Sequence, residues 1–153
     1  MRIHWAAVLP GLLLMLGCAE NTTVVGPEPP DASVVSRVQL TRLLPTPGEP
    51  QLISDPVTVS SIVGSGAFAT WGWVAGSGRE LIPQYRLELL GENRVEAIYF
   101  LGTNSYPPKF PCYSFCSGWW VGTSQQDGSF DATRYRGLTS VWYFPLVDGL
   151  GIP

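Results

Sequence analysis

The amino-acid sequence predicts an α+β domain, built as a small antiparallel sheet with one or two short helices packed on it. Residues 85–89 alternate between apolar and polar side chains, and a mostly apolar stretch over 95–101 returns after a polar turn, which indicates a β-hairpin. Asp55-Pro56 is a typical helix start. The chain is 45% hydrophobic and 14% charged, which suits a compact domain. An all-β sandwich or barrel is the alternative.

The first predicted strand lies within residues 34–44. Val38 and Leu40 fall on one face and polar side chains on the other, because a strand alternates its side chains. The proline-rich stretch 45–50 then ends the strand.

Asp55 offers a capping carboxylate, and Pro56 suits the first helical position. Val59 and Ile62 follow at helical spacing, and Gly64 can end the helix. The many β-branched residues between them would also suit a strand. We expect a short helix.

In the hairpin, Tyr85, Leu87 and Leu89 share one face of the first strand. The second strand is apolar on both faces over residues 98–101, so we expect it to be central and covered on both sides.

The C-terminal third contains one clear strand and one ambiguous segment. Residues 118–122 predict a strand and residues 126–129 a turn. Residues 135–144 fit both helical and strand periods, and Pro145 is expected to end either element.

The N-terminus has the pattern of a secretory signal peptide. Arg2 precedes an apolar run over residues 5–16, which would span only about 18 Å as a helix, less than a bilayer core of roughly 30 Å. Leu14-Met15-Leu16-Gly17-Cys18 resembles the lipobox of bacterial lipoproteins, with Met15 where leucine is usual.

The lipobox resemblance implies cleavage before Cys18 and a diacylglycerol on its sulfur, so that the membrane is reached through a lipid anchor. Ala19, where aspartate would favour the inner membrane, implies the outer membrane, facing the periplasm or the cell surface. We therefore expect a signal peptide over 1–17, a flexible tether over 18–32, one globular domain over 33–147 and a tail over 148–153.

Composition excludes several function classes for the processed chain. Removing Arg2 leaves eight basic residues against twelve acidic ones, a formal charge of −4, so a nucleic-acid partner is not expected. His4 is the only histidine and would leave with the signal peptide. Without imidazole, the common nucleophile–base pairs and zinc ligands are missing. We expect no cofactor, no metal and no enzymatic activity; an acid–base hydrolase using Asp and Glu alone is the weaker alternative.

Cys112 and Cys116 are an even pair in an exported chain, which predicts a structural disulfide. A redox pair is the alternative, although such pairs normally have two intervening residues and this one has three.

Six aromatic residues fall within fifteen positions around these cysteines, and four of them are the candidate binding residues: Tyr106, Tyr113, Trp119 and Trp120. The neighbouring tryptophans must point to opposite faces of a strand. We expect both rings to be buried, one of them under a helix; the alternative is that one ring is partly exposed and binds a ligand.

The pattern over residues 56–101 resembles small SmpA/OmlA-like outer-membrane lipoproteins, through an Asp-Pro helix, Trp71-Gly72-Trp73 and the following hairpin. The expected function is a lipid-anchored cell-envelope domain with a binding or structural role, its partner an envelope protein or glycan. An inhibitor of an exported enzyme, acting through the Cys112–Cys116 loop, is the alternative.

Overall fold

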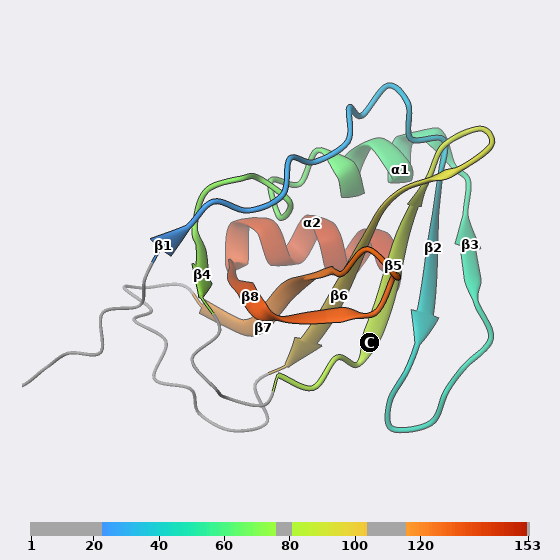
Figure 1. Cartoon of the computed structure of the whole chain (residues 1–153). Helices are drawn as coiled ribbons and strands as arrows, with labels where there is room; N and C mark the ends of the chain where they lie inside the picture. The colour runs from blue at the N-terminus through green and yellow to red at the C-terminus, as the bar shows by residue number, and fades with distance from the viewer. Residues whose placement is uncertain (1–22, 76–80, 104–115, 153) are drawn as a thin grey trace, which may run out of the picture.

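The computed structural model describes residues 23–75, 81–103 and 116–152. These residues form an eight-stranded antiparallel open sheet with two short helices, which confirms the predicted α+β class (Figure 1). The elements in chain order are β1 (Thr23–Val24), β2 (Arg37–Arg42), β3 (Gln51–Ile53), α1 (Pro56–Val63), β4 (Trp73–Ala75), β5 (Tyr85–Leu90), β6 (Val95–Thr103), β7 (Cys116–Ser124), β8 (Phe130–Thr139) and α2 (Ser140–Leu150). In this part of the chain, no helix is long and apolar enough to cross a membrane.

The strand order is β1-β4-β8-β7-β6-β5-β2-β3, so that β1 and β3 form the two edges of the sheet. The predicted hairpin is confirmed as β5 and β6, which pair antiparallel. Strand β6 lies in the middle of the sheet, and Tyr99, Phe100 and Leu101 are all buried. Because these neighbours point alternately to the two faces, the expectation that this strand is covered on both sides is confirmed.

Helix α1 forms where the capping signal predicts it. The Asp55 carboxylate accepts hydrogen bonds from the Thr58 backbone N–H at 2.8 Å and from the Thr58 hydroxyl at 2.7 Å. These bonds satisfy a backbone donor that has no partner within the helix. Val59 and Ile62, one turn apart, are buried against the sheet, so the apolar stripe outweighs the β-branched content.

Residues 135–144 contain both of the elements that their sequence allows. Strand β8 continues to Thr139, and α2 begins at the next residue. The prediction that Pro145 ends the element is wrong, because α2 continues through it to Leu150. Burial explains the extension, because the residues after the proline face the core: Leu146, Val147 and Leu150.

Residues on both sides of the predicted domain, 33–147, also lie against the sheet. Thr23 and Val24 pair with β4, so the end of the predicted tether lies along the sheet. At the other end, Leu150 is fully buried and Ile152 is 8% exposed, within the segment expected to be a tail. Strand pairing at the N-terminal end and apolar burial at the C-terminal end hold these flanking residues to the sheet.

The two helices cover one face of the sheet (Figure 1), and we call this the helix face. Its core combines both helices with inward-pointing residues of β2, β5, β6, β7 and β8. The opposite face, called the outer face, carries a smaller buried cluster: Phe100, Trp120 and Tyr135.

Candidate functional site

Several predicted site residues lie outside the described part of the chain: Cys18, Tyr106, Cys112 and Tyr113. Cys116 begins β7, but its side chain is also outside the described part. Lipidation at Cys18 and the disulfide between Cys112 and Cys116 therefore stay predictions.

Trp119 and Trp120 are neighbours on β7 and point to opposite faces of the sheet, as the sequence predicts. Trp120 is fully buried in the outer-face cluster. Trp119 is half-buried and packs against the core of the helix face. Of the two rings, only Trp119 is therefore placed to touch a ligand without unfolding.

Glycines make room for Trp120 to lie flat on the sheet. A Cβ on Gly102 would stand 2.4 Å from Cζ2 of Trp120 and 2.7 Å from the backbone oxygen of Ile82. A Cβ on Gly122 would stand 3.2 Å from Cζ3 of the same ring and 2.5 Å from the Phe130 ring. Such close approach of ring to backbone is possible only at glycine, which makes Trp120 a structural residue.

Trp119 belongs to a row of aromatic rings on the helix face. Its ring centroid is 6.1 Å from that of Tyr85 on β5 and 5.9 Å from that of Tyr143 on α2. Phe144 extends the row, 5.3 Å from Tyr143 and 57% exposed. We call these four residues the aromatic row. Offset and edge contacts at such distances hold the rings in fixed mutual positions.

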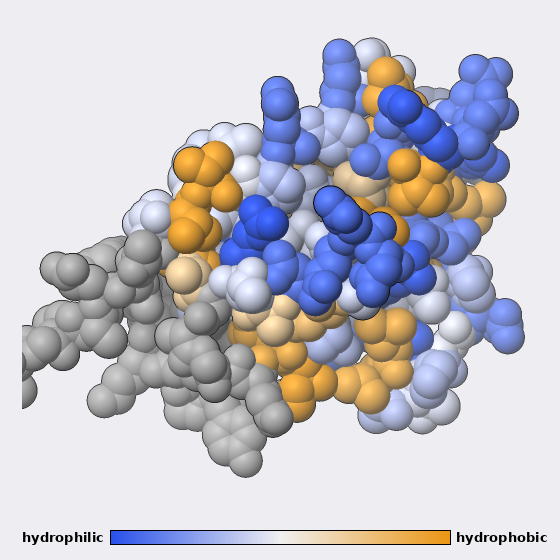
Figure 2. Space-filling model, in the orientation of Figure 1, coloured by the Kyte–Doolittle hydropathy of each residue, from blue (hydrophilic) through white to orange (hydrophobic). Residues whose placement is uncertain are grey.

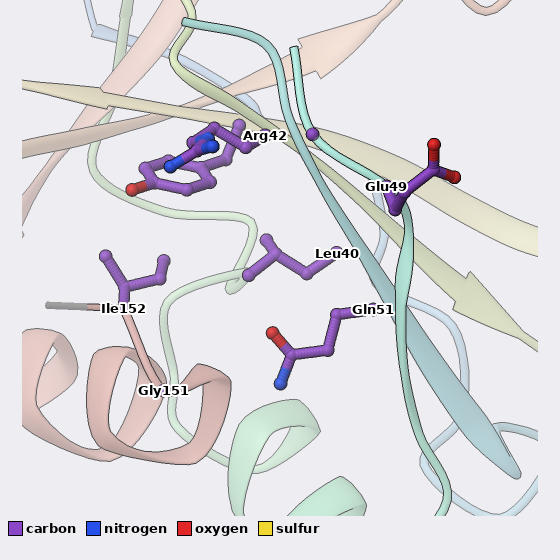
Figure 3. A pocket seen from close by; sticks show the side chains of 8 residues that line it. Leu40, Arg42, Glu49, Gln51, Gly151 and Ile152 are labelled. Carbon is purple, nitrogen blue, oxygen red and sulfur yellow. The ribbon is translucent and has the colours of Figure 1, made fainter. Parts of the chain in front are cut away.

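At Tyr85 the aromatic row meets a groove with a volume of about 260 Å³. The groove lies between the strands β2, β3 and β5 and the residues that follow α2. Its lining consists of Leu40, Arg42, Gly48, Glu49, Gln51, Tyr85, Gly151 and Ile152. Leu40 and Gln51 extend into it from the strands, and Ile152 faces them from the other side (Figure 3).

Arg42 supplies the positive charge of the groove and is held at the end of β2. Its Nε donates to the carbonyl oxygen of Thr46 at 3.1 Å, and its own carbonyl accepts from the Gly48 N–H at 3.0 Å. These bonds close the turn after β2 and orient the guanidinium toward the groove. The carboxylate of Glu49 points away from the cavity (Figure 3), so Arg42 is the charged group of the lining that faces it.

The carboxylates that an acid–base hydrolase would need have partners outside the groove. Glu88 accepts from Gln39 at 2.6 Å and pairs with Arg86 at 2.8 Å on the outer face. Asp127 accepts from the hydroxyl and the N–H of Ser129 within its own turn, and these bonds hold the pKa of its carboxyl below the usual range.

Two further acids of the hairpin and β8 are also tied to arginines. Glu96 pairs with Arg94 at 2.8 Å. Burial alone would raise the pKa of Asp131, but hydrogen bonds from Thr133 and Arg134 outweigh it and lower that pKa. Within the described ranges, no two carboxylates line the groove together, and no cluster of three His, Cys, Asp or Glu is suited to a metal ion.

The groove is a feature that the sequence did not predict. Its lining joins the β2–β3 hairpin, the start of β5 and residues 151–152, which are far apart in the chain. One signal was present, because Ile152 is an apolar residue directly after a glycine that ends a helix.

The chain matches no protein-family model, no curated protein and no solved structure.

Proposed function

We propose that this chain is a lipid-anchored binding domain of the bacterial cell envelope, with the groove and the aromatic row as its ligand-binding surface. The observation that carries the proposal is their continuity at Tyr85, which lines the groove and stacks on Trp119. One surface thus offers aromatic rings beside a fixed guanidinium, an arrangement that orients a ligand as well as holding it.

The size of the groove limits what it can enclose. Pockets for drug-sized molecules usually measure about 300–1,000 Å³, and this groove measures about 260 Å³. It suits one side chain or one sugar ring of a larger partner, with the rest of the partner lying over the aromatic row. An envelope protein or a glycan fits this description.

The proposed localisation is based on the sequence. The lipobox-like segment ends at Cys18, and a diacylglycerol there supplies two acyl chains, which is what stable anchoring requires. The chemistry of the groove supports binding rather than catalysis, since its acid, Glu49, points away and the processed chain has no histidine.

Site-specific photo-crosslinking in intact cells tests the proposal. Benzoylphenylalanine replaces Phe144, which is 57% exposed at the end of the aromatic row, or Val95, which is 46% exposed at the far end of the β5–β6 hairpin. We expect a discrete crosslinked product from position 144 and none from position 95.

A second change assigns the product to the groove. Arg42→Gln removes a charge-assisted hydrogen bond worth about 1.5–3 kcal/mol, so binding should weaken roughly tenfold or more. Arg37→Gln is the matched control, since Arg37 lies at the other end of β2 and donates to Gly91 O. Equal crosslinking in both variants would contradict the proposal.

A further inference from the structure

Two large apolar side chains are exposed on neighbouring chain segments at the β1 edge of the sheet. Val25 is 79% exposed and Trp71 is 61% exposed. The chain segments that carry them run together, since the Gly26 N–H donates to the Thr70 carbonyl at 2.8 Å and Val24 pairs with Trp73. Figure 2 shows apolar atoms exposed on the side of the sheet where β1 and β4 lie.

The buried guanidinium of Arg136 stacks on one face of the Trp71 ring. The guanidinium carbon of Arg136 lies 4.5 Å from the ring centroid, and Arg136 is only 1% exposed. Nη1 of Arg136 donates to three carbonyl oxygens of the preceding loop, those of Gly66, Ala67 and Ala69, at 3.0–3.3 Å. Burial lowers the pKa of Arg136 to about 10, so the charge persists at neutral pH. The exposed face of the indole is thus presented in a fixed orientation.

The pairing of β1 determines where the anchoring segment enters the domain. Cys18 precedes Val25 by seven residues, which span at most about 25 Å when fully extended. Since β1 pairs with β4, this short segment reaches the sheet at the same edge as Trp71. A lipid on Cys18 would therefore keep Val25 within about 25 Å of the bilayer surface, with Trp71 on the neighbouring segment.

We propose that Val25 and Trp71 form a membrane-docking patch, which enters the interfacial layer of the bilayer that carries the lipid anchor. This inference rests on the proposed anchoring at Cys18. Tryptophan favours the membrane interface, because its ring is largely apolar and its N–H remains near water. The nearest exposed charge along this segment is the acidic Glu28, so docking depends on the apolar side chains and not on anionic lipid.

Quenching by brominated lipid tests the docking. The full acylated chain is reconstituted into phosphatidylethanolamine–phosphatidylglycerol vesicles that contain lipid brominated near the headgroup. We expect tryptophan fluorescence to be quenched in the wild type and the quenching to be largely lost in Trp71→Phe. Trp119→Phe is the control, because Trp119 lies on the helix face away from this edge and its loss should leave the quenching intact.

A second pair of variants perturbs the patch without removing its reporter. Val25→Asp should reduce the quenching several-fold, since a carboxylate would have to enter the interface. Val57→Asp is matched to it, because Val57 is 78% exposed on α1 and outside the patch. Equal quenching in these two variants, or no loss in Trp71→Phe, would overturn the docking proposal.

Flotation of the same vesicles separates docking from anchoring. A chain that does not float with the vesicles lacks the anchor, which removes the basis of both proposals. A chain that floats while Trp71 stays unquenched keeps the anchor and overturns docking alone. Shielding of Trp71 from acrylamide by soluble peptidoglycan fragments, without quenching by brominated lipid, would also overturn it by assigning the ring to a glycan.

Discussion

Gly102 on the central strand β6 is the position where a single methyl group should be most revealing. The Cβ of Gly102→Ala would stand 2.4 Å from the Trp120 ring and 2.7 Å from the Ile82 backbone oxygen. The ring is fully buried and the other contact is backbone, so neither neighbour can yield cheaply. Overpacking of this kind costs about 1–3 kcal/mol, and we expect the free energy of unfolding to fall by that amount.

Gly137 supplies the matched control. It pairs with Trp120 on the neighbouring strand, and an added Cβ there would meet nothing within 4 Å. Gly137→Ala should be neutral or stabilise by up to about 1 kcal/mol, because alanine restricts the unfolded chain.

Urea unfolding followed by far-UV circular dichroism compares the two variants. A second measurement repeats Gly102→Ala in a Trp120→Leu background, where the ring contact is gone and the added cost of the methyl group should shrink. If Gly102→Ala and Gly137→Ala unfold within about 0.5 kcal/mol of each other, a difference small compared with the overpacking cost, the reasoning about Trp120 is refuted.

Two further predictions concern the helices and the acids. Pro145→Ala should stabilise α2 by roughly 2 kcal/mol, because alanine can donate a hydrogen bond to the Val141 carbonyl. This gain outweighs the greater freedom that alanine gives the unfolded chain. An unchanged urea midpoint would contradict this prediction. Hydrogen bonds from Thr58 lower the pKa of Asp55, and those from its turn lower that of Asp127. These hydrogen bonds stabilise the folded state fully above the unfolded carboxyl pKa of about 4, and this stabilisation is lost as the pH falls through the lower folded pKa values. The melting temperature should therefore drop below about pH 4. The drop should be smaller in Asp55→Asn, which has no carboxyl group to protonate at that position.

Local signals explain what the sequence could predict. The β5–β6 hairpin follows from alternation and a polar turn, and α1 follows from Asp55-Pro56 and a terminal glycine, all within one stretch of chain. The opposite orientation of Trp119 and Trp120 follows from strand geometry alone. These features depend only on neighbours in sequence.

The remaining features depend on contacts that local patterns do not encode. Pro145 argues locally against a helix, but burial of the residues after it outweighs the lost hydrogen bond. The groove requires β2, β5 and Ile152 to meet, and the position of the Trp71 ring requires Arg136, sixty-five residues away. Only the strand order brings these segments together, and periodicity does not reveal strand order.

The strand order also makes the sheet a spacer of definite width. Seven strand-to-strand steps separate the β1 edge, where Trp71 lies, from the β3 edge beside the groove. At roughly 4.8 Å a step, this is about 34 Å. A domain resting on its β1 edge would hold the groove at about that height above the lipid. A partner bound in the groove would then lie far from the bilayer surface, and a molecule lying flat on the same membrane could not contact the groove.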